Sequence, residues 1–537
     1  MTKQVQLCFL ETACTGSYMA SGQWRSPQDN GKTKDRIKYW TELAKLAERG
    51  KISAIFLADW YVGFDVYGGS LDACLKAGHQ VAHLDPVPLI SAMAAVTSSV
   101  AFAPTISTTY VKPYILARQL STLDHVTEGR CGWNIVTSHT NSSAQALGFD
   151  QIMGHDDRYV MAEEYMDVVY KLWESSWADD AVLWEQDLAI DPARVQRVEH
   201  KGKYFSVQGR SQVHPSPQRT PVLFQAGTSK SGTAFAARHA EAIFMNPATT
   251  KLCKAQISVA RAEAAAQGRD PSTLKFFPCI VPIIGRTEED AIAKHEEAKR
   301  HGDMIGGLAQ FSGYTGIDMS SFPLDEPFAA SSIKGGAAIQ AVLRSFEASV
   351  EGAEPWTPRR LGERMALGGL HPSPVGSAKQ VADFFEHWIN ETDCDGFNVA
   401  YVSNPGSFED VVELLVPELQ KRGIMWNDYA KPQGSFRENL LGHPYLAEDH
   451  YGAKFKYGRD PSLIRSGKSD EENTTVRAAS NGEAVEDGST SKSVKGASIV
   501  LQEAYGKAAE NHSRSADSHE QLGRVANGGP VVNSTTI

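Results

Sequence analysis

The sequence predicts an α/β protein whose strands close into a parallel eight-stranded barrel, the (β/α)8 architecture, with insertions. Eight short apolar runs rich in β-branched or aromatic residues recur between residues 5 and 402. Most are followed by a segment with helical spacing, and alternating strand and helix signals are typical of a parallel sheet covered by helices. A doubly wound open sheet is the alternative, but no G-x-G-x-x-G motif follows the first run, where a dinucleotide-binding half would carry it.

The predicted strands are joined by segments with helix signals. The strands span residues 5–11, 52–58, 99–104, 131–136, 222–226, 242–245, 275–284 and 396–402. Between the first two strands, Gly50 supplies a helix stop after apolar residues at helical spacing, namely Ile37, Trp40, Leu43, Ala44 and Ala47. Pro113 marks the start of another helix.

Two later helices carry capping signals. Ser377 and Gln380 form a capping-box pattern before an apolar helical run, and Ser407 and Asp410 stand in the same relation before the next one. In this motif the first side chain accepts a hydrogen bond from the backbone three residues later, so each pair predicts a helix start.

Three stretches fall outside the repeating pattern. Residues 178–220 and 301–370 fit neither strand nor core helix well, and we expect them to be insertions in a barrel that spans residues 1–467. Residues 468–537 contain no Trp or Phe and only one Tyr. Such a segment buries too little apolar surface to compensate the entropy of ordering, so we predict a low-complexity, disordered C-terminal tail.

Composition argues against several classes of protein. The hydrophobic share of 42% is enough for a substantial core, and the net charge of −11 argues against nucleic acid or an anionic membrane as a partner. No long apolar span and no signal-peptide pattern are apparent, and the seven cysteines are scattered without C-x-x-C pairing. We therefore expect a cytoplasmic enzyme with reduced thiols and no cysteine-based zinc site.

The segment LFQAGTSKSGTAFAARHAEAIF, residues 223–244, runs from a strand through a glycine-containing turn into an alanine-rich helix. Gly227 and Gly232 stand as in G-x-x-x-x-G-K-[ST], but Thr233 replaces the lysine that would contact the β and γ phosphates. The turn therefore does not indicate a nucleoside-triphosphate loop. The free N–H groups at a helix start still suit a single phosphate, although a tight strand-to-helix turn is an equally good explanation for the glycine.

Polar residues occupy the ends of four successive predicted strands. Asp59 follows the second predicted strand, and Thr105 follows the third. Asn134 lies in the fourth strand, and residues 137–139 come just after that strand. The glycine turn follows the fifth strand. Local hydrogen bonding could explain each residue alone. Because the carboxyl ends of barrel strands meet at one face, the residues together predict a site for a polar organic ligand with one phosphate.

Residues 154–177 predict a packed helix with an anion site at its start. His155 and Tyr159 stand four residues apart on one face near the N-terminus, where the helix dipole favours a phosphate, although a structural histidine explains the position about as well. Asp156 and Asp157 complement the same dipole, and without an H-E-x-x-H motif we predict no metal site. The packed face is an apolar stripe of Met161, Tyr165, Val168, Val169 and Leu172.

These motifs carry a resemblance to a known family. The runs DHVTEGRCGWNIVTSHTNSSAQALGFD, HDDRYVMAEEYMDVVYKLWESSW and PSPQRTPVLFQAGTSKSGTAFAARHAEAIF closely resemble the flavin-dependent monooxygenases of the nitrilotriacetate monooxygenase, dibenzothiophene-sulfone monooxygenase and pristinamycin synthase type, within the bacterial-luciferase-like superfamily. The resemblance covers about residues 5–450. It implies a (β/α)8 barrel with insertions, in agreement with the strand count.

The resemblance also implies a reaction and its partners. Members take reduced FMN from a separate NAD(P)H-dependent flavin reductase and use O2 to oxygenate a small organic substrate, in a reaction that can end in cleavage of a C–N or C–S bond. By analogy we expect a homo-oligomer, a dimer or a tetramer. We assign no residue as catalytic acid or base, because the sequence shows no partner for Asn134 or His139, the two groups within reach.

Five residues acquire roles from the resemblance. They are Asp59 and Thr105, which would line the flavin-ring pocket, His155 and Tyr159, which would reach the phosphate side, and Ser229, which would bind the FMN phosphate. The family often has Ser-Ser where this chain has Thr228 followed by Ser229, and a hydroxyl is kept at both positions.

Other functions fit the same residues. One is a related barrel that uses a deazaflavin to transfer hydride without oxygen, and another is a non-catalytic FMN-binding protein; a metal-dependent barrel hydrolase is more distant. Oxygen consumption separates the first from a monooxygenase, and tight retention of FMN would favour the second. Within the monooxygenase interpretation, residues 301–370, with the stretch GGLAQFSGYTG, are a candidate lid that excludes water from the ring.

Overall fold

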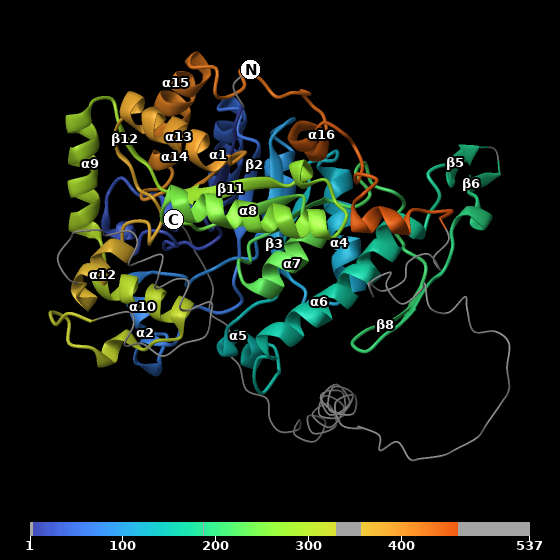
Figure 1. The fold of residues 1–537 in the computed structure, drawn as a ribbon, viewed down its shortest axis with the longest axis horizontal. Coiled ribbons are helices and arrows are strands. Elements are labelled where there is room, and N and C mark those ends of the chain that lie inside the picture. Colours follow the sequence, from blue (N-terminus) through green and yellow to red (C-terminus); the bar gives the residue numbers. More distant parts are fainter. Residues whose placement is uncertain (1–3, 186, 329–355, 460–537) are drawn as a thin grey trace, which may run out of the picture. The chain divides into compact units, whose positions relative to one another are not determined.

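A closed barrel of eight parallel strands lies at the centre of the computed structural model, which describes residues 4–185, 187–328 and 356–459 (Figure 1). The strand order around the barrel is β1-β14-β11-β10-β9-β4-β3-β2, and every neighbouring pair is parallel. The predicted fold class is confirmed. The predicted tail, residues 468–537, lies outside the described residues, so the division of the chain at residue 467 stays a prediction.

All the predicted strands occur, with ends that differ by a few residues. The barrel strands are β1 (Gln6–Thr12), β2 (Ala54–Ala58), β3 (Ala101–Ser107), β4 (Gly132–Val136), β9 (Val222–Gln225), β10 (Ala242–Met245), β11 (Lys275–Ile280) and β14 (Gly396–Val399). Their side chains alternate between the barrel interior and the surrounding helices. In β2, for example, Phe56 belongs to the interior cluster, whereas Ile55 and Leu57 pack with helix residues. Because side chains fill the interior, a ligand site is expected at one end of the barrel.

The predicted strand 275–284 is too long. The chain leaves the barrel after Ile280, and β12 (Ile283–Gly285) pairs with β13 (Val375–Ser377) in a separate two-stranded sheet. Pro282 between them has no N–H to donate to a barrel neighbour. The chain therefore changes its hydrogen-bonding partner within one continuous apolar run, and hydrophobicity alone does not show where this change occurs.

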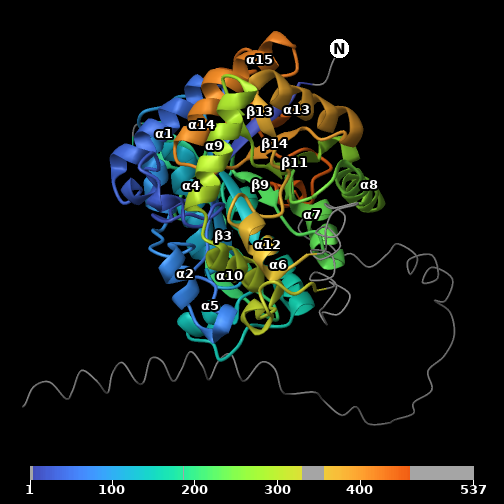
Figure 2. The ribbon, with the colours of Figure 1, turned by 90° about the vertical axis from the view of Figure 1, so that its left-hand side faces the viewer.

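Helices follow the strands and surround the barrel, as Figures 1 and 2 show. At one end α2, α5 and α10 lie together, and α16 lies at the other end. The helices are α1 (Ile37–Arg49), α2 (Asp72–Ala77), α3 (Val87–Ala94), α4 (Pro113–Val126), α5 (Asn141–Ala146), α6 (His155–Tyr170), α7 (Lys230–His239), α8 (Thr250–Ala266), α9 (Glu288–His301), α10 (Met304–Thr315), α12 (Pro358–Met365), α13 (Ala378–Thr392), α14 (Gly406–Asp410), α15 (Val416–Lys421) and α16 (Phe436–Leu441).

Most of the predicted helix signals are confirmed. Helix α4 begins at Pro113, α1 ends before Gly50, and Ser377 with Gln380 forms the capping box of α13, with both reciprocal hydrogen bonds present. The predicted stripe of α1 is buried except for Ile37, which is 60% exposed because it stands at the first helical position. The stripe predicted for α6 is buried throughout.

The capping box predicted from Ser407 and Asp410 is wrong. Helix α14 begins at Gly406, so Ser407 lies inside the helix, and the helix shows no side-chain cap. The Ser407 hydroxyl oxygen instead accepts hydrogen bonds from the backbone N–H groups of Val402 and Ser403, just after β14. The residue types matched the motif, but the hydroxyl stabilises the preceding turn.

The segment 178–220 contains regular structure that was not expected from its sequence. It forms two antiparallel strand pairs, β5 (Val182–Glu185) with β6 (Leu188–Ile190) and β7 (Val198–Lys201) with β8 (Ser206–Gly209). Both pairs are outside the barrel sheet, and the bounds of the insertion stay a prediction.

The segment 301–370 also contains regular structure, including a buried helix, which corrects the expectation that it has no core helix. Small residues let α10 approach its neighbours closely: a Cβ on Gly313 would lie 2.0 Å from the Phe64 ring, and one on Gly307 would lie 2.1 Å from the carbonyl oxygen of Gly362 on α12. The stretch GGLAQFSGYTG is therefore a packed helix in this structure. Residues 329–355 lie outside the described part of the chain, and the lid stays a prediction.

The amino-terminal end of the barrel is closed by a buried ion pair. Arg437 of α16 donates from Nε and Nη2 to the two carboxylate oxygens of Glu241, at 2.7 and 2.9 Å. Glu241 also accepts the backbone N–H of Leu223 in β9 at 3.1 Å. This end of the barrel is thus occupied by protein groups that satisfy each other, and the opposite end remains for a ligand.

The cysteines are all buried and none forms a disulfide. In the part of the chain that the structure describes, no helix is both long enough and apolar enough to cross a bilayer.

Candidate functional site

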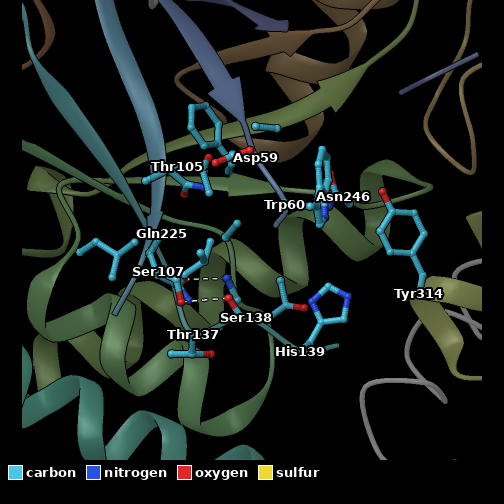
Figure 3. A pocket seen from close by; sticks show the side chains of 18 of the residues that line it. Asp59, Trp60, Thr105, Ser107, Thr137, Ser138, His139, Gln225, Asn246 and Tyr314 are labelled. Carbon is cyan, nitrogen blue, oxygen red and sulfur yellow. Dashed lines mark hydrogen bonds between the residues drawn. The ribbon is translucent and has the colours of Figure 1, made fainter. Parts of the chain in front are cut away.

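A cavity of about 490 Å³ lies at the carboxyl ends of the barrel strands (Figure 3). Residues at the ends of β2, β3, β4, β9 and β10 line it, together with the starts of α6 and α7. Its wall includes every residue that the sequence predicted for the site: Asp59, Thr105, His155, Tyr159 and Ser229. The successive strand ends thus line one cavity, and the roles of these residues stay predictions.

Side-chain hydrogen bonds join the ends of β3 and β4. Asn134 Nδ2 donates to Thr105 Oγ1 at 3.0 Å, and Ser138 Oγ donates to Ser107 Oγ at 2.9 Å. Asn134 is buried, yet its Oδ1 has no hydrogen-bond partner within the described residues. A buried acceptor without a partner is costly unless a ligand supplies a donor, so Asn134 marks a place where a bound molecule can donate an N–H group.

The glycine turn between β9 and α7 is shaped by Tyr159. Ser229 is the N-cap of α7, and its Oγ accepts the backbone N–H of Gly232 at 3.1 Å and also interacts with the Tyr159 hydroxyl group. A Cβ on Gly227 would lie 2.6 Å from the Tyr159 hydroxyl oxygen, and one on Gly232 would lie 2.8 Å from it. The close approach of α6 thus accounts for both glycines without a triphosphate loop.

The first turn of α6 contributes an arginine that the sequence argument did not select. Arg158 is buried in the cavity wall, its Nη1 donates to the Met153 carbonyl oxygen, and its Nε has no partner among the described residues. Burial lowers the pKa of Arg158, although a guanidinium remains charged at neutral pH. His155 is half-exposed beside it, with Nδ1 2.8 Å from Asp156 Oδ1 and its ring 5.3 Å from the Tyr159 ring.

Asp59 is held in surroundings that disfavour its charge. Burial, and secondarily the nearby Asp85 carboxylate, raise the pKa of Asp59 to about 7. His83 Nε2 lies 3.2 Å from Asp59 Oδ1, but no hydrogen bond of good geometry joins them, and burial lowers the pKa of His83 to about 4. The imidazole is therefore neutral at pH 7, and Asp59 can hold or release a proton beside the cavity.

The side of the cavity away from the hydroxyl groups is aromatic. Figure 3 shows Trp60, Tyr314 and His139 on one side and Ser107 and Gln225 on the other. Trp60 could have been selected from the sequence because it directly follows Asp59. Tyr314 could not, because it comes from α10, in the segment that carried no strand-end signal.

No metal centre is apparent in the described ranges of the chain, where no group of three His, Cys, Asp or Glu side chains could hold an ion.

Fold and cavity together define the class: a (β/α)8-barrel enzyme whose ligand site lies at the carboxyl ends of its strands. Comparison with known proteins identifies the family. The profile described as Luciferase-like monooxygenase matches residues 17–392, and the chain belongs to this family of flavin-dependent monooxygenases.

Two characterised relatives cover most of the chain. Dimethyl-sulfide monooxygenase of Hyphomicrobium sulfonivorans is 41% identical over 444 residues, which are 82% of this chain and 91% of the relative. Long-chain alkane monooxygenase of Geobacillus thermodenitrificans is 39% identical over 460 residues, which are 85% of this chain and 99% of the relative. A crystal structure of riboflavin lyase with modified FMN and riboflavin has a TM-score of 0.76 and 34% identity, covering 84% of this chain and 100% of that one.

The enzymes named by the resemblance are also relatives. A component of nitrilotriacetate monooxygenase is 36% identical, dibenzothiophene-sulfone monooxygenase is 33% identical, and one polypeptide of pristinamycin IIA synthase is 30% identical. The family predicted from the motifs is therefore confirmed.

Proposed function

We propose that the cavity binds reduced FMN, delivered by a separate NAD(P)H-dependent flavin reductase, and that the protein uses it with O2 to oxygenate a small organic substrate. Family membership supports the use of reduced flavin and oxygen. The riboflavin lyase structure, which has modified FMN in the same fold, supports FMN as the flavin. The observation in this chain that carries the proposal is the cavity wall formed by α6 and α7.

That wall suits a phosphate for two independent reasons. The first turn of α7 directs free N–H groups and the positive end of its dipole toward the cavity, and the Ser229 hydroxyl can donate there as well. Arg158 adds a buried guanidinium whose Nε is unpartnered among the described residues. A charge-assisted bond from Arg158 to a phosphate oxygen would satisfy that group, and we place the FMN phosphate between Arg158 and Ser229. Tyr159 and His155 stand beside it, as the resemblance implies.

The polar strand ends suit the flavin ring. Its pyrimidine portion presents N–H donors and carbonyl acceptors, and Asn134 Oδ1 offers an acceptor that has no partner within the described chain. Thr105 holds the Asn134 amide from the other side through the bond at 3.0 Å. We therefore propose that Asp59, Thr105 and Asn134 face the ring.

When bound, reduced flavin supplies the electrons that activate O2 for transfer of one oxygen atom to the substrate. The residues of this chain have simpler tasks. Arg158 and Ser229 anchor the phosphate, Asn134 orients the ring edge, and the aromatic side excludes water from the space beside the ring. Asp59, with a pKa near 7, can hold a proton at its carboxyl oxygen close to neutral pH.

The partners and setting of the enzyme follow from the same proposal. The names of two relatives describe each as one part of a larger enzyme system, which supports a second component, and we take this to be the flavin reductase. Buried cysteines without disulfides support a cytoplasmic location. We also propose a homo-oligomer, a dimer or a tetramer, which light scattering would measure.

The test is oxygen incorporation. The full chain would be supplied with reduced FMN by a general flavin reductase under labelled O2, with a panel of small thioethers and hydrocarbons as substrates. We expect O2 uptake that depends on FMN and one labelled oxygen atom in the product. Conversion of substrate without O2, driven by a reduced deazaflavin, would contradict the proposal and favour the hydride-transfer alternative.

A further inference from the structure

The aromatic end of the cavity is a continuous set of rings, defined here as Tyr18, Trp60 and Tyr314 with His139. The Tyr18 and Trp60 rings are 4.3 Å apart, and the hydroxyl groups of Tyr18 and Tyr314 are hydrogen-bonded to each other. Phe64 supports this end from behind, with its ring 5.2 Å from Tyr314 and 6.2 Å from His139. In Figure 3, Trp60, Tyr314 and His139 stand around one side of the open space.

The polar groups at this end are uncharged at neutral pH. Burial raises the pKa of Tyr314 to about 12 and raises the pKa of Tyr18 well above its usual value. Burial also lowers the pKa of His139, and it lowers the pKa of His371, a further lining residue, to about 4, with the Arg364 guanidinium acting in the same direction. These side chains can form hydrogen bonds with a ligand, but they do not neutralise an anion.

On the described part of the cavity wall the ionised groups offer little to an anionic substrate, and the Arg364 guanidinium acts on His371 from outside that wall. Among the described residues of its wall, Arg158 is the one Lys or Arg side chain, and the proposed function assigns it to the FMN phosphate. Asp59 lies on the wall next to Trp60 and carries a negative charge above its pKa of about 7. A carboxylate placed at the aromatic end would lose its hydration and, among the described residues of the wall, would find no cation besides Arg158.

We infer that the aromatic end is the substrate subsite and that it takes an uncharged, weakly polar molecule, such as a thioether, and rejects polycarboxylates. The inference rests on the proposed function, because it takes the flavin phosphate to occupy Arg158. Trp60 and the Tyr18–Tyr314 pair supply flat apolar surface for the body of such a substrate. His139 offers a neutral hydrogen-bonding group at its edge.

Two thioethers of nearly the same shape test the charge preference. Diethyl sulfide and thiodiglycolate each carry a sulfur between two two-carbon arms, and only the second is a dianion. We expect the full chain with FMN to bind diethyl sulfide, measured by ligand-observed saturation-transfer NMR, and to bind thiodiglycolate at least about 100-fold more weakly. Equal or tighter binding of thiodiglycolate, or binding of neither compound by a chain that does bind FMN, would overturn the inference.

A separate titration with FMN alone distinguishes failure of the inference about the substrate class from failure of the proposed function. If FMN does not bind, the proposed function fails and the inference fails with it. If FMN binds and the dianion is preferred, only the substrate class is wrong. Consumption of each thioether with reduced FMN and O2 gives a second readout of the same preference.

Replacement of Trp60 tests the location of the subsite. Trp60→Ala should weaken diethyl sulfide binding at least about tenfold, because a large aromatic contact is lost, while FMN affinity changes much less. Trp184→Ala is the matched control, because Trp184 is 78% exposed on β5 and is not part of the cavity wall. Unchanged thioether affinity in Trp60→Ala would place the substrate elsewhere.

Discussion

At the scale of single residues, the cavity contains groups that the protein alone leaves incompletely satisfied. Within the described chain, Asn134 Oδ1 and Arg158 Nε have no hydrogen-bond partner, and Asp59 lies where burial disfavours its ionised form. Such groups reduce stability and are retained where a ligand completes them. The cavity is therefore built to be completed by a ligand that carries a negative charge at one end and hydrogen-bond donors at the other.

The Asp59→Asn variant should be more stable than the wild type at high pH. Between about pH 4 and pH 7 an unfolded Asp59 ionises while the folded one keeps its proton, so wild-type stability falls as the pH rises through this window and stays lower above it. The asparagine avoids this loss. We expect the variant's advantage in free energy of unfolding to grow to about 2–4 kcal/mol by pH 8.

Urea unfolding of both proteins at pH 4, 6 and 8 measures this difference. An advantage that is constant over the pH range would mean that the pKa of Asp59 is not raised. Flavin affinity should fall in the same variant, because the proposal places Asp59 at the ring.

At the scale of elements, the α6 start and the β9–α7 turn fit together as one unit. Tyr159 of α6 reaches Gly227 and Gly232, and Ser231 Oγ donates to Asp156 Oδ1 at 2.7 Å. The proposed phosphate donors of α6 and α7 are thus held at a fixed spacing by packing that excludes a side chain on either glycine.

A double-mutant cycle tests this fit. Gly232→Ala should lower stability by about 1–2 kcal/mol, although alanine normally favours a helix, because its Cβ would lie 2.8 Å from the Tyr159 hydroxyl oxygen. Adding Tyr159→Phe removes that oxygen and should restore about 1 kcal/mol. Gly406→Ala is the control, since the nearest atom to its Cβ would be 3.9 Å away. Additive losses of stability in the cycle would show that the close approach of Tyr159 does not require a glycine at position 232.

At the scale of the whole molecule, the two ends of the barrel have different tasks. The amino-terminal end holds the Arg437–Glu241 pair, whose groups satisfy one another, and the carboxyl end holds the cavity with its incompletely bonded groups. This division is typical of (β/α)8 barrels, in which one face stabilises and the other carries function.

Loss of Arg437 should therefore affect stability and leave the site intact. Arg437→Met leaves the buried Glu241 carboxylate without its cation and should cost about 3–5 kcal/mol of stability. Arg359→Met breaks the exposed pair with Asp325 and should lower stability much less, because solvent screens that pair. Thermal unfolding measures both, and FMN affinity at a temperature where both proteins are folded should match the wild type. Equal losses in the two variants would contradict the assigned role of the buried pair.

The barrel could be predicted because each short apolar run in the sequence coincides with a buried strand of the structure. The predicted strand 242–245 matches β10 (Ala242–Met245), and Asp59, Thr105 and Ser229 were found because a parallel barrel brings strand ends together. The path of the chain after Ile280 could not be predicted, because the apolar run continues while the hydrogen-bonding partner already changes at Val281.

The rest of the site depends on tertiary contacts that have no local signal. Arg158 resembles a solvated residue in the first turn of a helix, and its burial follows only from the fold. Tyr314 reaches the cavity on α10, whose many glycines and small residues weaken a helix signal while allowing close packing. Apart from Arg158, the residues of the proposed phosphate side could thus be selected from the sequence, whereas Tyr18, Trp60 and Tyr314 of the aromatic end were not selected.

The most direct test of the central claim compares the affinities of FMN and riboflavin, which differ only in the phosphate, by quenching of flavin fluorescence. We predict that the wild type binds FMN about 100-fold more tightly and that Ser229→Ala reduces this preference about tenfold without weakening riboflavin. Thr249→Ala, which removes the equivalent N-cap of α8, should cost about 1 kcal/mol of stability and leave the preference unchanged. Equal affinity of the wild type for FMN and riboflavin would contradict a phosphate site at α7, and with it the proposed function of the cavity.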